Sequence, residues 1–273
     1  MEILHGLIGI LYFKMLLFLR QRKSMKLKLP NWGSLCNPNL LLNSDFQSGI
    51  INQKGKSSYN TLNKYTIDMW KLVRGTLTVG SGFITINGEI MQNAYNASGQ
   101  HLFAIYVASG SGSIKFDGVS TTKTLTTGLN IVSVNGTITG VHIVGTSLKV
   151  NYCKFEKGSY FTGMPLWNEA LELLKCKRSY RIVKAKSKGD VIAIVPTDNE
   201  GLFQIPMDIS GMIKRPSVNI KDIWTNSRGV YSQASTHSVY DDSIIFKCDT
   251  KNATVQVYFD STDAYIVADS YDY

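Results

Sequence analysis

The chain has 273 residues, a formal net charge of +9 at pH 7 and four cysteines. Apolar residues make up 44% and charged residues 18%, which excludes both a disordered polymer and a small disulfide-stapled domain. The length allows one large domain or two smaller ones. The 23 glycines, with many Ser, Thr, Asn and Tyr, are typical of β-sheets joined by tight turns.

The positive charge is concentrated at the N-terminus, since residues 1–30 carry six Lys and Arg side chains and one Glu. The rest of the chain is too weakly basic for a nucleic-acid-binding surface. Residues 3–19 are almost wholly apolar, but Lys14 interrupts them, and a membrane span needs about 20 residues. Three interpretations of segment 1–36 therefore remain. It is a helix that docks on a partner, a stretch added by a start codon placed ahead of Met25 or, least favoured, a weak membrane anchor.

From residue 39 onward, short apolar stretches alternate with turn residues. Asn87-Gly88, Asp117-Gly118 and Asn135-Gly136 supply the positive φ that two-residue hairpins require. No crossover helix interrupts this block, so the pattern predicts a jelly-roll β-sandwich domain over residues 37–157. The strands predicted for it are 40–46, 75–79, 83–86, 102–108, 114–116, 130–134, 136–144 and 147–155.

One helix is predicted from Leu166 to about Tyr180, with Leu166, Ala170, Leu173 and Leu174 at helical spacing. It belongs to a linker that we place at 158–182. The β pattern then returns and predicts a C-terminal β-sandwich domain over residues 183–273, so the fold class is mainly all-β. The strands predicted there are 191–195, 202–205, 217–223, 243–247, 254–259 and 264–268.

The chain shows no catalytic or cofactor motif in a suitable strand-turn-helix setting. His5, His101, His142 and His237 are far apart in the sequence, and so are the four cysteines, which we expect to be reduced thiols. Glu169 and Glu172 fit a solvated helix flank better than a pair of catalytic acids. We therefore predict no enzyme activity, no cofactor and no metal site.

Seven short segments, taken in order, form a recognisable pattern. The first three are residues 39–46 (NLLLNSDF), 52–55 (NQKG) and 65–70 (YTIDMW), and the others are 155–159 (FEKGS), 171–180 (LELLKCKRSY), 212–218 (MIKRPSV) and 263–269 (DAYIVAD). Together they resemble tail-fibre or receptor-binding proteins of tailed bacteriophages and prophages, and the first three are similar to the opening of that family. The resemblance spans about residues 37–273. Met69 and Lys177 depart from it, standing where the family commonly has Arg and Gln. We expect Asp68 and Trp70 to be structural, with Trp70 in the core.

The resemblance implies a virion protein of a phage tail, assembled in the cytoplasm of the bacterial host. Its implied partners are the host cell-surface polysaccharide and other tail proteins, with a homotrimer giving avidity. Residues 224–242 form a predicted long loop without periodicity, rich in aromatic side chains. Its candidate glycan-binding residues are Trp224, Arg228, Tyr231, His237 and Tyr240.

The same sequence also fits other interpretations of residues 224–242 and of the function. The aromatic side chains of residues 224–242 fit equally well into the interior of an ordinary long loop. A second alternative is a structural tail or baseplate component that docks other virion proteins without binding sugar. In that case segment 1–36 would be the part that inserts into the partner. A depolymerase that cleaves the host polysaccharide is the third alternative, and the lack of convergent acids disfavours it.

Overall fold

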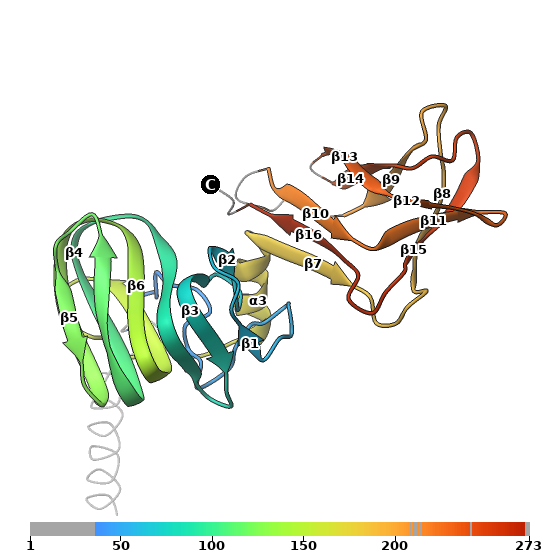
Figure 1. The fold of residues 1–273 in the computed structure, drawn as a ribbon. Helices are drawn as coiled ribbons and strands as arrows, with labels where there is room; N and C mark the ends of the chain where they lie inside the picture. Colours follow the sequence, from blue (N-terminus) through green and yellow to red (C-terminus); the bar gives the residue numbers. More distant parts are fainter. Residues whose placement is uncertain (1–35, 208, 210–211, 213–214, 241, 271–273) are drawn as a thin grey trace, which may run out of the picture. The chain divides into compact units, whose positions relative to one another are not determined.

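The computed structural model describes residues 36–207, 209, 212, 215–240 and 242–270. These residues form strands throughout, apart from one helix, which confirms the mainly all-β prediction (Figure 1). Apart from Cys36, the predicted docking segment 1–36 lies outside the described residues. Within the described part of the chain, no helix is long and apolar enough to cross a membrane.

The chain divides into a small compact unit and a large one, and the described residues of the small unit are 36–38 and 162–165. In this unit the Asn37 backbone N–H donates to Thr162 Oγ1 at 2.8 Å. The second unit holds residues 39–161 and 166–273, and its described part contains every strand and the helix.

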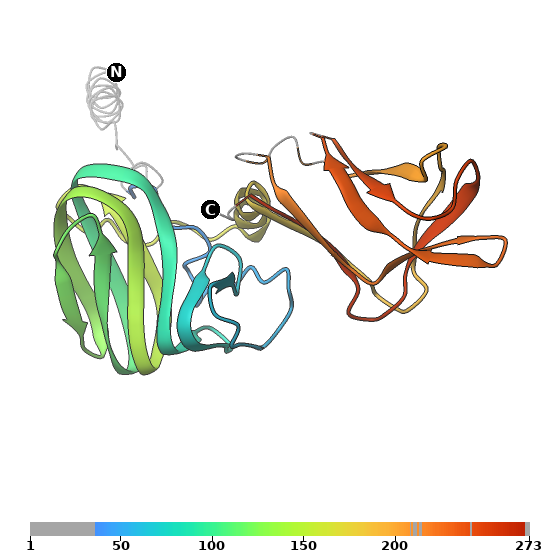
Figure 2. The same cartoon turned by 45° about the horizontal axis from the view of Figure 1, so that its top comes forward.

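The first six strands form the jelly-roll β-sandwich (Figure 2). Two of them are very long and take part in both layers, because each bends from one layer into the other. Residues 84–93 pair with 140–150, whereas residues 101–107 pair with 150–157 on one side and 128–134 on the other. The strands are β1 (Ser58–Tyr59), β2 (Lys64–Tyr65), β3 (Lys71–Val79), β4 (Ile84–Asp117), β5 (Thr122–Leu125) and β6 (Gly128–Lys157).

Glycines mark the place where the first layer bends. Gly75 of β3 pairs with Gly88 of β4, Gly88 with Gly145 of β6, and Gly145 with Gly112 further along β4. A Cβ atom on Gly88 would lie 2.1 Å from the Arg74 carbonyl oxygen, so no larger residue fits there. The Asn87-Gly88 step therefore bends a strand in place of the predicted hairpin turn.

The jelly-roll core is built from the inward side chains of both layers. Trp70 is fully buried, as predicted, and its ring centroid lies 6.0 Å from that of Phe46. Residues 40–46, predicted as a strand, run along β6 in bends and turns and are not a strand. Leu40 N donates to Phe155 O and Cys153 N donates to Ser44 O, so the segment still satisfies that edge of β6.

Asn43 explains why this segment is irregular. It is completely buried with φ of 49°, a left-handed conformation that asparagine tolerates better than most residues. Its side-chain amide donates to the carbonyl oxygens of Ile51 and Asp68, both at 2.8 Å, and its Oδ1 accepts from Ile51 N at 2.7 Å. The Trp70 indole N–H donates to its carbonyl oxygen, and its own N–H donates to Glu172. Asn43 therefore joins two parts of the segment before β1, the loop between β2 and β3, and the helix.

The helix, α3 (Glu169–Lys177), is shorter than the predicted 166–180. Asn168 caps its start, accepting a hydrogen bond from Leu171 N at 3.0 Å. Three residues of the predicted apolar stripe, Leu166, Ala170 and Leu174, are exposed. The helix packs Cys176 against Ile51 and Met69, and Leu173 of the predicted stripe packs against this cluster.

The C-terminal β-sandwich domain has its own core, in which Phe203 and Phe246 stack at 5.6 Å between ring centroids. Its strands form three antiparallel sheets with the orders β10-β16-β7, β12-β11-β15-β8 and β13-β14-β9. The strands are β7 (Tyr180–Lys184), β8 (Val191–Pro196), β9 (Leu202–Pro206), β10 (Ser217–Lys221), β11 (Ile223–Ser227), β12 (Val230–Gln233), β13 (Ser235–Val239), β14 (Ser243–Lys247), β15 (Thr254–Phe259) and β16 (Tyr265–Asp269).

The prediction of a long loop over residues 224–242 is wrong, because this segment contains most of β11 and all of β12 and β13. Its strands lack an apolar alternation because two of their buried residues, Thr225 and Ser232, are polar. The two hydroxyl oxygens lie 2.9 Å apart and form a hydrogen bond, which satisfies them inside the core.

We predict that Asn43→Ala strongly destabilises the protein. It leaves the Ile51 N–H and the Asp68 carbonyl without their partner, at about 1–3 kcal/mol for each unsatisfied group, whereas the Ile51 carbonyl still accepts from Asp68 N. The free energy of unfolding, measured by denaturant titration, should fall by at least about 2 kcal/mol. Asn219→Ala, at an exposed position of β10, is the matched control and should change it little. Equal effects of the two variants would contradict this role for Asn43.

A second prediction concerns Asp68, which is buried and accepts hydrogen bonds from the Gln53 backbone and side chain. Burial raises its pKa from 3.8 to about 6, although Gln53 and the nearby Lys54 oppose the rise. Between pH of about 4 and 6, the folded chain holds a proton that the unfolded chain has lost. This group therefore lowers the free energy of unfolding as pH rises through that window, by at most about 3 kcal/mol.

The measurement is chemical denaturation from a pH of about 4 to a pH of about 7. Asp68→Asn should flatten the fall in the free energy of unfolding, whatever its effect on stability at a single pH. Asp263→Asn, which removes an exposed carboxylate, should leave the fall unchanged. An Asp68→Asn profile parallel to that of the unsubstituted chain would disprove the assignment.

Candidate functional site

The solvent-facing side of the sheet β12-β11-β15-β8 is the candidate site. Along β15 the side chains alternate, so that Val255, Val257 and Phe259 enter the core. Gln256 and Tyr258 consequently point outward. The register places Trp224 of β11 opposite Tyr258 and Asn226 opposite Gln256.

Strand β12 extends this surface by one more column, because Gln233 pairs with Trp224, and Tyr231 pairs with Asn226. Two cross-strand rows result. One row holds Gln233, Trp224 and Tyr258, and the other holds Tyr231, Asn226 and Gln256, so each strand carries one aromatic and one amide side chain. Tyr231 is 60% exposed, whereas Trp224 and Tyr258 are half-buried. We name these residues the aromatic–amide face: Trp224, Asn226, Tyr231, Gln233, Gln256 and Tyr258.

Most polar side-chain groups of this face make no hydrogen bond within the described chain. Within the described chain, no hydrogen bond engages the side chains of Trp224, Tyr231, Gln233, Gln256 or Tyr258. Partial burial raises the pKa of Tyr258, and the neighbouring Asp260 and Tyr231 add to the rise, so its hydroxyl stays protonated at neutral pH. The face therefore presents indole, phenol and amide hydrogen-bond donors beside flat rings.

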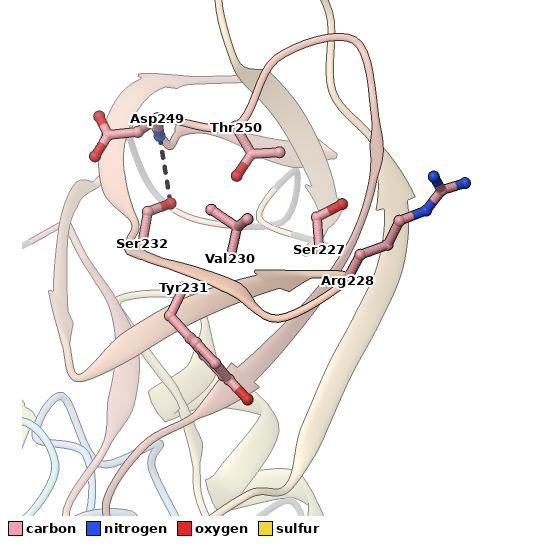
Figure 3. Close-up of a pocket in the computed structure, with 7 residues that line it drawn as sticks. All are labelled: Ser227, Arg228, Val230, Tyr231, Ser232, Asp249 and Thr250. Atoms are coloured by element: carbon pink, nitrogen blue, oxygen red, sulfur yellow. Dashed lines mark hydrogen bonds between the residues drawn. The ribbon is translucent and has the colours of Figure 1, made fainter.

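Arg228 and Gly229 form the turn between β11 and β12. Their φ angles of 50° and 86° match a two-residue type I′ hairpin, and Gly229 N donates to Asn226 Oδ1 at 2.9 Å. Arg228 is exposed, and its guanidinium points away from the neighbouring side chains (Figure 3). Arg228 therefore lies at the end of the hairpin, with its side chain in solvent.

The opposite side of this hairpin borders an open hollow of about 460 Å³. Figure 3 shows Val230 and Ser232 on the side of the hollow, with Tyr231 pointing the other way. Ser232 Oγ accepts from Asp249 N at 3.3 Å. The hollow is shallow and lacks stacked rings, so it is a weaker candidate than the aromatic–amide face. It is lined by Ser227, Arg228, Val230, Tyr231, Ser232, Asp249 and Thr250.

Of the five residues predicted to bind glycan, the structure brings only Trp224 and Tyr231 together on one face. His237 lies at a bulge in β13, and Tyr240 follows that strand, so both belong to a different sheet. Sequence reasoning missed Asn226, Gln233, Gln256 and Tyr258. The regular alternation of residues 254–259 was the signal that could have found the last two.

On the jelly-roll domain, His142 joins two carboxylates. Its Nδ1 lies 2.9 Å from Glu89 Oε1, and its Nε2 lies 2.9 Å from Asp117 Oδ2. Partial burial would raise the pKa of Glu89, but hydrogen bonds from Arg74 and His142 outweigh it and hold the pKa below its usual value. Glu89 forms ion pairs with Arg74 and Lys115, and Asp117 contacts the His142 ring. No group of three or more metal-ligating side chains occurs among the described residues.

Comparison with known proteins gives little further information. No family model and no curated protein matches the chain. Among solved structures, the chain is similar to vicilin from Corylus avellana (hazelnut), with 8% sequence identity and a TM-score of 0.13. That similarity covers 69% of this chain and 76% of the vicilin chain. At this TM-score the likeness carries no argument about fold or function.

We predict that Arg228→Asn stabilises the protein by about 0.5–1 kcal/mol, because asparagine accepts the left-handed conformation more readily than arginine. Thermal unfolding measures the change, which should appear as a small rise in Tm. The control is Lys251→Asn, which removes an exposed positive charge outside the strands and should leave Tm unchanged. A lower Tm for Arg228→Asn would show that the guanidinium itself stabilises the hairpin.

Proposed function

We propose that this chain is a tail-fibre or receptor-binding protein of a bacteriophage virion that adheres to host cell-surface glycans through the aromatic–amide face. The observation that carries the proposal is one exposed sheet surface with three aromatic and three amide side chains. Five of these six side chains make no hydrogen bond within the described chain.

The chemistry of this surface suits sugar recognition. The C–H face of a pyranose stacks on a flat aromatic ring, and the amides bond the sugar hydroxyl groups as donors and acceptors. Each contact is weak. A homotrimer that presents three copies of the face would raise the overall affinity by avidity.

The assignment to a phage tail is supported by where the resembling segments lie. Asn43, Gln53, Asp68 and Trp70 come from three segments of the resemblance, 39–46, 52–55 and 65–70, and they meet in one hydrogen-bonded cluster. Glu172, from the helix segment, joins the cluster by accepting a hydrogen bond from Asn43 N at 3.2 Å. A shared structural role for these residues gives the order of the segments a physical reason.

We predict that Trp224→Ala and Tyr231→Ala each weaken glycan binding at least about tenfold, equivalent to about 1.4 kcal/mol. Binding of the full chain is first screened on a glycan array and then measured by calorimetry. His237→Ala and Tyr240→Ala, on the other sheet, are the matched controls and should bind as the unsubstituted chain does.

Two results would contradict the proposal. Unchanged binding by folded Trp224→Ala and Tyr231→Ala would place the glycan elsewhere. A folded chain that binds no glycan on the array or on host cells would favour the structural tail component.

A further inference from the structure

We propose that the ligand of the aromatic–amide face is an uncharged polysaccharide that lies across the strands, with successive sugars over β12, β11 and β15. This inference rests on the proposed function and names the class and orientation of its ligand.

The first argument is charge. The outward positions of β8, β11, β12 and β15 carry no charged side chain, and all four strands lie within the described residues. An anionic sugar would lose hydration on this face without gaining an ion pair. A neutral sugar meets amides and hydroxyls that match its own hydroxyl groups. These outward positions are Val191, Ile194, Pro196, Trp224, Asn226, Tyr231, Gln233, Thr254, Gln256 and Tyr258.

The second argument is shape. Along β11 the face is only two side chains long, Trp224 and Asn226, before the turn at Arg228. Across the sheet it is four strands wide, and neighbouring strands are about 4.8 Å apart. The long dimension of the face therefore runs across the strands, over about 14 Å from β12 to β8.

The third argument is the order of the rings. Each of these three strands carries one ring, so a ligand that crosses the sheet passes a ring on every strand. Trp224 of β11 and Tyr258 of β15 share one cross-strand row, and Tyr231 of β12 lies in the neighbouring row. An amide from the other row lies beside each ring. Beyond Gln256, the 70% exposed Ile194 of β8 ends the face with an apolar side chain. A ligand that ran along a strand would meet one ring and then leave the sheet.

The test uses the folded full chain and calorimetry with a size series of neutral glucose and galactose oligosaccharides, from one to six sugars. A matched series contains uronic acids. Affinity should rise at least about tenfold from one sugar to four and then level off, since the face ends at β8. The neutral series should bind at least about tenfold more tightly than the uronic series.

A charge variant makes the test specific to this face. Gln256→Glu, at an exposed position, replaces an amide donor with a carboxylate that only accepts hydrogen bonds, and it should weaken binding of the neutral series at least about tenfold. Gln256→Asn keeps the amide and should retain most of the binding. His237→Glu adds the same charge to the other sheet and should have no effect. Circular dichroism and Tm confirm that each variant is folded.

The outcomes separate this inference from the proposed function. Tighter binding of the uronic series, affinity independent of length, or full binding by Gln256→Glu would overturn the inference. If Trp224→Ala still weakens binding in such a case, glycan adhesion through the face stands. If neither series binds and host cells are not bound, the proposed function itself fails.

Discussion

The loops beside the jelly roll and the helix are held together by the hydrogen bonds of Asn43. Its backbone N–H, its carbonyl oxygen and both ends of its side-chain amide have partners. These lie in the segment before β1, in the loop between β2 and β3, and in the helix α3. In a buried, left-handed position, asparagine supplies both the conformation and the hydrogen bonds. Because α3 leads directly into β7, the same residue fixes where the chain leaves the jelly roll.

Sequence reasoning predicted the β class and most strands, because the apolar alternation that defines them is a local property. It failed where a strand buries polar residues. Thr225 and Ser232 satisfy each other inside the core, so β11 and β12 resemble a loop in the sequence. It also mistook Asn87-Gly88 for a hairpin, because a positive φ serves a bend as well as a turn and only the pairing partners distinguish the two.

The candidate site was predictable only in part for a related reason. Composition pointed to Trp224 and Tyr231, but it pointed equally to His237 and Tyr240. The two pairs are separated by strand register, which places the first pair on one sheet beside Tyr258, a residue distant in sequence. Register depends on contacts between remote segments, and a single sequence does not display them.

The inward and outward side chains of β15 have different roles, and this difference decides which substitutions the strand tolerates. Its inward residues hold the core, whereas its outward residues contact only solvent and their neighbours across the sheet. Substitutions on the outward side therefore leave the packing of Val255, Val257 and Phe259 intact. This surface can therefore change one side chain at a time while the scaffold beneath it stays the same.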